Sequence, residues 1–147
     1  IKIPNITLTT DIMVGFPGET EENFWDTLDI LDQVRYDSAF MFIYSIRKGT
    51  VAEKMDNHID KLVKKDRFNR LIAKANKIAK EKNSEYKDLV LEVLVEGFSK
   101  KDKTKLMGRS RQNKLVNFPG DESLIGSLVN VKITETKSFS LNGIALD

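Results

Sequence analysis

The sequence predicts an α/β segment followed by a small all-β domain. Residues 6–60 show two apolar runs separated by a helical pattern, and a second helical pattern extends to about Ser84. After Asp88 the hydrophobic period changes from helical to two, which is the period of strands. The 147 residues are enough for one ordinary domain or two small ones. We therefore predict one domain over residues 1–85 and a second over residues 86–147.

The first 60 residues predict a βαβ unit. The run Ile6–Val14 is apolar and β-branched with little alternation, which is typical of a strand covered on both faces in a parallel sheet. A Gly-Phe-Pro-Gly turn ends it, and Thr20 can then cap a helix whose first turn is acidic. The apolar positions of this helix follow helical spacing: Phe24, Leu28 and Leu31. A second strand is expected over Ala39–Tyr44, so the order is strand, helix, strand.

The remaining elements are a long basic helix and a set of short strands. The helix is expected from about Asp60 to Ser84, because its apolar residues form one stripe. The strands are expected near Leu89–Val95, Lys105–Ser110, Lys114–Phe118, Val129–Ile133 and Phe139–Leu146. About five strands in about 60 residues predict a small closed barrel of the oligonucleotide-binding (OB) kind.

The charges are unevenly distributed along the chain. Residues 1–60 carry a net charge of −6, residues 61–85 carry +6 and residues 86–147 carry +2. Seven basic residues between Gly97 and Phe118 are opposed only by Asp102, and such clustering suits a polyanionic partner. The alternative is a solvated, lysine-rich loop.

The composition excludes several classes of protein. The chain has no run of about 20 apolar residues that could span a bilayer, and no secretory signal is evident, so we expect a cytoplasmic protein without a membrane partner. Since there are no cysteines, disulfides, thiolate zinc sites and cysteine-ligated clusters cannot form within these residues. His58, the only histidine, is interpreted as a surface residue, and Asp26, Asp29 and Asp32 as the solvated face of a helix.

The turn after the first strand is a candidate binding site. Glycines allow close backbone approach, and the free amides at a helix start attract anionic or polar groups. In a βα barrel this turn would lie at the C-terminal face of the strands, where binding sites gather. The alternative is that glycine and proline simply end the strand.

Two segments resemble a known family. The segment TTDIMVGFPGETEENF, followed by FIYSIRKGT, resembles the last two βα units of the radical S-adenosylmethionine (SAM) barrel of tRNA methylthiotransferases. The segment GRSRQNKLVNFPGDESLIGSLVNVKITETKSFSLNGIAL resembles the C-terminal TRAM domain of the same enzymes. The resemblance implies a TIM-like partial barrel followed by a five-stranded OB-like barrel. It also implies that SAM and 4Fe–4S clusters serve the whole enzyme.

The resemblance implies two sets of site residues. Part of the SAM adenine pocket would come from Ile12, Val14, Gly15, Glu19, Ser45 and Arg47. The anticodon stem-loop of tRNA would be bound by Lys103, Lys105, Arg109, Arg111, Asn113, Lys114, Asn117 and Phe118. The spacing of Arg109, Arg111 and Lys114 predicts that their cationic groups project to one side and meet phosphates. Phe118 offers a stacking face for a base, and the alternative is core packing.

By resemblance, the whole enzyme would add a methylthio group to C2 of N6-isopentenyladenosine beside the anticodon. These residues should be inactive alone, because the family's cluster ligands are cysteines in a CxxxCxxC loop. Two alternatives are a methylthiotransferase acting on an aspartate of a ribosomal protein and a non-catalytic RNA-binding module. Exposed barrel edges at the first two strands predict self-association or partial disorder.

Overall fold

The structure, a computed structural model, describes residues 3–146. It contains two compact units, and each is considered by itself. One comprises Leu8–Ile78, and the other comprises the residues from Ala79 onward together with those up to Thr7. The break between the units falls inside a helix, whereas the boundary that we predict after Glu85 lies beyond the end of that helix and stays a prediction.

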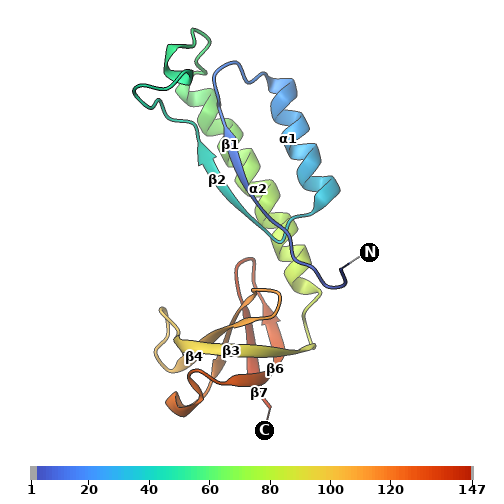
Figure 1. Ribbon diagram of the computed structural model, residues 1–147. Coiled ribbons are helices and arrows are strands. Elements are labelled where there is room, and N and C mark those ends of the chain that lie inside the picture. The colour runs from blue at the N-terminus through green and yellow to red at the C-terminus, as the bar shows by residue number, and fades with distance from the viewer. Residues whose placement is uncertain (1–2, 147) are drawn as a thin grey trace. The chain divides into compact units, whose positions relative to one another are not determined.

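The first unit is built on a βαβ motif (Figure 1). Strand β1 covers Thr9–Val14, helix α1 covers Glu21–Val34 and strand β2 covers Ser38–Ile43. The two strands pair in parallel, with Thr9 opposite Ser38 and Val14 opposite Ile43. The predicted strand, helix and strand are confirmed, although β1 begins three residues later than expected.

Helix α1 starts where its capping residue predicts. The Thr20 hydroxyl accepts a hydrogen bond from the Asn23 amide at 3.1 Å, and the Asn23 side chain accepts one from the Thr20 amide at 3.1 Å. This reciprocal pair satisfies two of the amides that the helix start leaves without intrahelical partners. Glu21 and Glu22 add negative charge to the first turn, where the helix dipole favours it.

Both helices contribute to the core of the first unit. Helix α2 covers Lys61–Ser84, close to the predicted bounds, and a short 3₁₀ helix covers Ala52–Lys54 before it. The buried side chains are Val14, Phe24, Leu28, Leu31, Leu71 and Ile78. Burial alternates along β1, since Val14 is buried and Asp11 and Met13 are exposed. Within the described residues, therefore, only one face of the strand pair is covered. The prediction that β1 is covered on both faces is wrong for this part of the chain.

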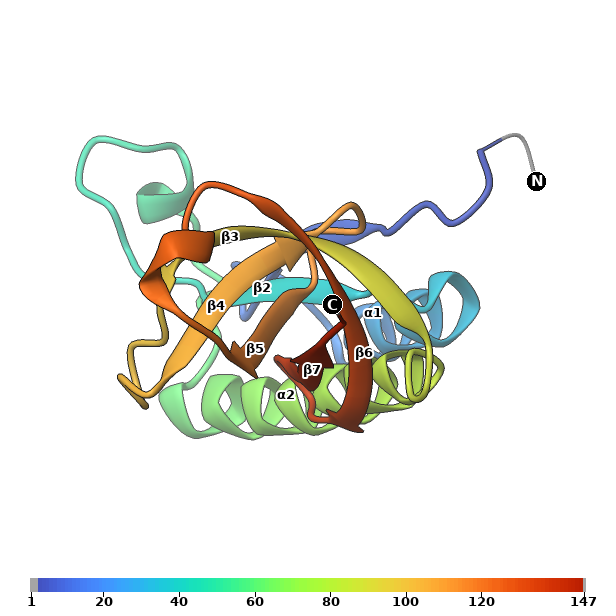
Figure 2. The same cartoon turned by 90° about the horizontal axis from the view of Figure 1, so that it is seen from below.

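The second unit is a closed five-stranded barrel, whose strands are labelled in Figure 2. Its strands are β3 (Val90–Phe98), β4 (Lys105–Ser110), β5 (Leu115–Pro119), β6 (Leu128–Thr136) and β7 (Leu141–Ala145), with a 3₁₀ turn over Glu122–Leu124. Their order is β3-β4-β5-β7-β6, and β6 closes on β3. All neighbours are antiparallel except β5 and β7, which are parallel. The predicted OB-like barrel is confirmed.

The barrel interior is filled by alternate residues of the five strands, as a period of two requires. The fully or nearly fully buried residues are Leu91, Val93, Val95, Leu106, Val116, Phe118, Val131, Ile133 and Leu141. Gly143 lies where β7 meets β6 so closely that an added Cβ would be 2.5 Å from the main-chain oxygen of Lys132. The register between these strands shifts between Ile133 and Glu135, and this bulge places Glu135 opposite Asn142.

Candidate functional site

The turn after β1 is held by a buried ion pair. Gly15 has a φ of 76°, and its amide donates to the Glu19 carboxylate at 2.8 Å. Arg67 of α2 binds the same carboxylate at 2.6 Å and also donates to the Glu19 main-chain oxygen at 2.9 Å. The side chains of Arg67 and Glu19 are only 6% and 11% exposed. Glu19 therefore anchors the turn to α2, a role that the sequence does not reveal.

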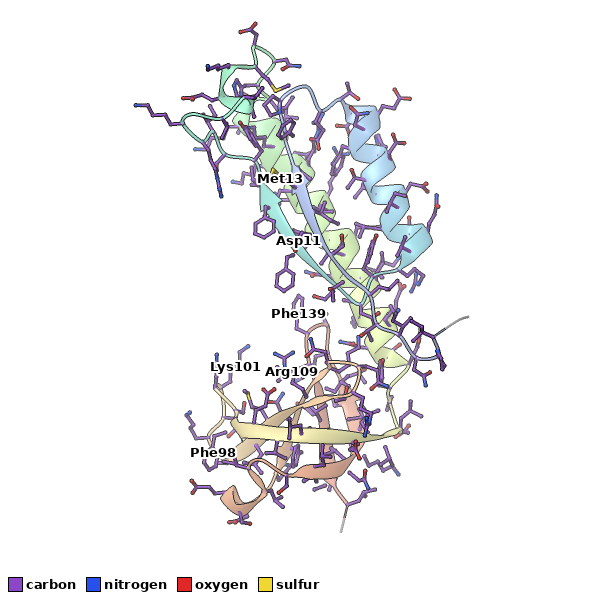
Figure 3. The ribbon with its side chains drawn as sticks, viewed as in Figure 1. Asp11, Met13, Phe98, Lys101, Arg109 and Phe139 are labelled. Carbon is purple, nitrogen blue, oxygen red and sulfur yellow. The ribbon has the colours of Figure 1, made fainter. Side chains whose placement is uncertain are left out.

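The two apolar residues predicted near adenine point into the protein core. Val14 is fully buried and Ile12 is half-buried against the same cluster. The alternate residues Asp11 and Met13, labelled in Figure 3, form the exposed face of the strand.

That exposed face continues onto β2 and is rich in apolar groups. Phe40 lies opposite Asp11 and is 62% exposed, and Phe42 lies opposite Met13 and is 49% exposed. Sequence reasoning missed this set, because the apolar runs of β1 and β2 carry little alternation. The one available signal was Asp11, a carboxylate within an otherwise apolar strand.

Ser45 and Arg47 lie in the exposed loop that follows β2. The Arg47 main-chain oxygen accepts the Thr50 hydroxyl at 2.8 Å, which fixes the loop backbone and leaves the Arg47 side chain in solvent. Tyr44, one residue earlier, is buried and stacks on His58 with the ring centres 6.2 Å apart. His58 is thus half-buried and not the surface residue that we predict.

In the barrel, the two predicted arginines are exposed and paired with glutamates of β3. Arg111 binds Glu92 at 2.7 Å, and Arg109 lies 3.9 Å from Glu96. Arg109 also donates to the main-chain oxygen of Asn113, which occupies the left-handed region with a φ of 56°. These are exposed pairs, which phosphates can replace at little cost.

Two predicted RNA-binding residues are buried. Lys114 is 8% exposed, and its ammonium lies 5.3 Å from the centre of the Tyr86 ring. It does not project with Arg109 and Arg111, because the turn at Asn113 interrupts the strand alternation. Phe118 is fully buried in the barrel core, so core packing, the alternative weighed for it, is what the structure shows. Its ring is not available to a base.

A surface hollow of about 450 Å³ lies on the barrel beside β4, β5 and β7. Five cationic residues line it, namely Lys100, Lys101, Lys105, Arg109 and Lys137. Lys101 and Arg109 are labelled on the barrel in Figure 3. Among the described residues that line the hollow, Asp102 alone is acidic. A hydrogen bond from the Thr104 hydroxyl, and then Lys105, lower the pKa of Asp102 below its usual range.

Apolar and amide side chains also line the hollow. Met107 and Leu115 contribute the apolar part, and Asn117 and Asn142 contribute the amides. Phe139, labelled in Figure 3, lies in the loop between β6 and β7, lines the hollow and is 73% exposed. Cations, amides and one open aromatic ring are the groups that bind phosphates, base edges and base faces of single-stranded RNA.

The hollow contains some predicted residues and others that the sequence did not suggest. Lys105, Arg109 and Asn117 line it, whereas Lys103, Arg111 and Asn113 are not among its lining residues. Lys137, Phe139 and Asn142 were missed, because they follow the basic cluster by more than twenty residues in the chain. Strands β4 and β5 are the second and third strands of the barrel. In OB folds, the face of these two strands and the neighbouring loops bind oligonucleotides.

The part of the chain that the structure describes holds no group of three or more histidine, aspartate or glutamate side chains placed to bind a metal ion. Asp32 instead forms an ion pair with Lys74 of α2, and Asp29 accepts a hydrogen bond from Gln33. No helix over residues 3–146 is long and apolar enough to cross a membrane.

Residues 86–146 match the family model of the TRAM domain, so the barrel with its basic hollow is a domain of that class. The chain is 67% identical over 142 residues to the tRNA-2-methylthio-N(6)-dimethylallyladenosine synthase of Alkaliphilus oremlandii. The aligned part is 97% of this chain and 30% of that protein. It is 58% identical over 147 residues to the synthase of the same name from Clostridioides difficile, covering 99% of this chain and 31% of that protein. For the Clostridium perfringens synthase the identity is 60% over 142 residues, with coverages of 97% and 32%.

Over nearly its whole length the chain is similar to these tRNA-2-methylthio-N(6)-dimethylallyladenosine synthases, in line with the resemblance of its two segments, and residues 86–146 form a TRAM domain. It spans about 30% of the length of these curated relatives.

Proposed function

We propose that this chain is part of an enzyme that methylthiolates an N6-isopentenylated adenosine of tRNA, and that its barrel holds the RNA. The observation that carries the proposal is the hollow on the barrel, which five cations and two amides line together. Cations supply affinity for any phosphate backbone, and the exposed Phe139 ring supplies a stacking surface. The names of the relatives support tRNA as the substrate over a ribosomal protein.

The first unit would contribute to the cofactor pocket. We propose that the main chain at Ile12, Val14 and Gly15, with the loop at Ser45 and Arg47, borders the SAM adenine. The exposed position of the Ser45 and Arg47 side chains fits such a role. Glu19 would act indirectly, because its carboxylate holds the Gly15 amide and Arg67.

The iron–sulfur clusters of the proposed enzyme need ligands from elsewhere. Cluster irons are held by cysteine thiolates, and this sequence has no cysteine. We propose that the clusters are bound by parts of the enzyme other than these residues. Catalysis by these 147 residues alone is therefore not expected.

Binding of the 147-residue chain to an anticodon stem-loop RNA should weaken steeply as salt rises. Each phosphate contact contributes a slope of about 0.7 to 0.9 in log K against log salt concentration. The double variant Lys101→Ala/Arg109→Ala should lower that slope by about 1.4 to 1.8. Fluorescence anisotropy over a salt series measures both quantities.

Lys132→Ala is the matched control, since Lys132 is an exposed lysine of β6 outside the hollow. Its slope should equal that of the unchanged chain. If the unchanged chain binds no RNA at low salt, the tRNA proposal is wrong and the ribosomal-protein alternative is favoured. If Lys132→Ala alone lowers the slope, the RNA lies on another face.

The exposed face of β1 and β2 should drive self-association of the isolated chain. Met13, Phe40 and Phe42 are each about half or more exposed there, and each strand has one described neighbour. Light scattering should show species larger than the monomer at high protein concentration. Replacing Phe40 and Phe42 with serine should reduce them, and a monodisperse unchanged chain would contradict the proposal.

A further inference from the structure

Four outward side chains form one row across the barrel strands that carry the hollow. Met107 of β4 lies opposite Asn117 of β5, Asn117 lies opposite Asn142 of β7, and Asn142 lies opposite Glu135 of β6. The first three line the hollow. Glu135 is the last residue of the row, and the bulge in β6 places it opposite Asn142.

The Glu135 carboxylate determines the orientation of the Asn142 amide. The Asn142 Nδ2 atom donates to Glu135 Oε2 at 2.5 Å. An ionised carboxylate only accepts hydrogen bonds, so the opposite amide orientation would place two acceptors against each other. The Asn142 hydrogen bond, and then Lys137, lower the pKa of Glu135, so the carboxylate stays ionised at neutral pH.

A fixed amide offers a fixed hydrogen-bonding pattern. With Nδ2 held by Glu135, the Asn142 carbonyl oxygen is turned away from the carboxylate and remains an acceptor, while the second amide hydrogen remains a donor. An acceptor beside a donor is the pattern by which asparagine pairs with adenine, whose exocyclic amine donates and whose ring nitrogen accepts. A uracil stacked in the same position as the adenine would present its O4 carbonyl where adenine presents its amine, so the amide orientation disfavours uracil in that position.

The surroundings of Asn142 suit an unpaired base. Phe139 is open to solvent and can stack on a base face, and Lys137, which also lines the hollow, can bind a phosphate. We propose that Asn142, oriented by Glu135, is a specificity-determining residue that reads the amine-bearing edge of an unpaired adenine in the bound RNA. This inference rests on the proposed function, because it requires that RNA occupies the hollow.

The test compares single-stranded oligoadenylate and oligouridylate of equal length, bound to the 147-residue chain in the same buffer. The unchanged chain should prefer oligoadenylate by about 5- to 150-fold, the range for one bidentate base contact. In Glu135→Gln, a neutral amide replaces the carboxylate and permits both orientations of Asn142. The adenine-to-uracil ratio should therefore fall severalfold, because oligoadenylate binding weakens, while the loss of a negative charge slightly strengthens oligouridylate binding.

Phe139→Ala is the matched control, since it should weaken both oligomers through lost stacking and keep most of the ratio. Circular dichroism of each variant checks that the barrel is folded, and Asn142→Ala should lose the ratio as Glu135→Gln does. Equal binding of both oligomers by the unchanged chain, or an unchanged ratio in Glu135→Gln, overturns this inference and leaves the proposed function standing. Failure to bind either oligomer or the stem-loop overturns the proposed function together with it.

Discussion

Replacing Arg67 with alanine should destabilise the first unit by about 3 to 5 kcal/mol, the usual cost of removing one partner from a buried ion pair. Arg67 donates to Glu19 and Glu21 and to the Glu19 main-chain oxygen. Without it, the Glu19 carboxylate, which is 11% exposed in the unchanged protein, would keep the Gly15 amide as its remaining described donor. The turn after β1 should then loosen along with the helix packing.

Trp25, the only tryptophan, lies in α1 and reports on this unit. Its fluorescence during urea titration should show a lower midpoint for Arg67→Ala. Lys74→Ala is the control, because it removes the partner of Asp32 in an ion pair that is 32% and 51% exposed. That variant should lose at most about 1 kcal/mol. Equal losses in the two variants would mean that the Arg67 pair is not the anchor that its burial indicates.

Replacing Phe118 with alanine should destabilise the barrel by about 3 to 5 kcal/mol, because it removes a fully buried ring and leaves a cavity. Hydrogen exchange of the strand amides measures this loss. Phe139→Ala should leave the exchange unchanged, since Phe139 is 73% exposed, but should weaken RNA binding by about 1 to 3 kcal/mol per stacked base.

The two phenylalanines thus separate stability from binding. Phe118→Leu keeps an apolar side chain in the core and should retain RNA binding. A loss of RNA binding in Phe118→Leu with normal strand protection would contradict the assignment of Phe118 to the core. If Phe139→Ala binds RNA with unchanged affinity, base stacking on Phe139 is not part of RNA binding.

Local patterns were sufficient for the elements. The strand expected over Lys105–Ser110 has those bounds in the structure, and the long basic helix ends at Ser84 as predicted. Thr20 caps α1 because its hydroxyl needs only the amide three residues ahead. These features depend on neighbours within a few residues, so the sequence alone contains their cause.

The sequence did not show in the same way which strand residues face outward and which face the core. Alternation places Arg109, Arg111 and Lys114 in a simple series only if the chain stays extended through them. Asn113 instead turns the chain with a positive φ, and Lys114 becomes buried beside Tyr86. Similarly, Phe118 follows Val116 at a spacing of two and enters the core with it, which charge clustering could not indicate.

The amino-acid pattern was enough to predict the order of strands and helices, the basic character of residues 97–118 and the resemblance to tRNA methylthiotransferases. Which side chains share the hollow became visible only in the folded barrel. Asn117 and Asn142 meet because β5 and β7 pair in parallel, and Glu135 reaches Asn142 through a bulge. Pairing between distant strands depends on closure of the whole barrel, and no local pattern specifies it. The basic cluster that the sequence revealed therefore supplies part of a surface to which the β6–β7 loop adds Lys137 and Phe139, and β7 adds Asn142.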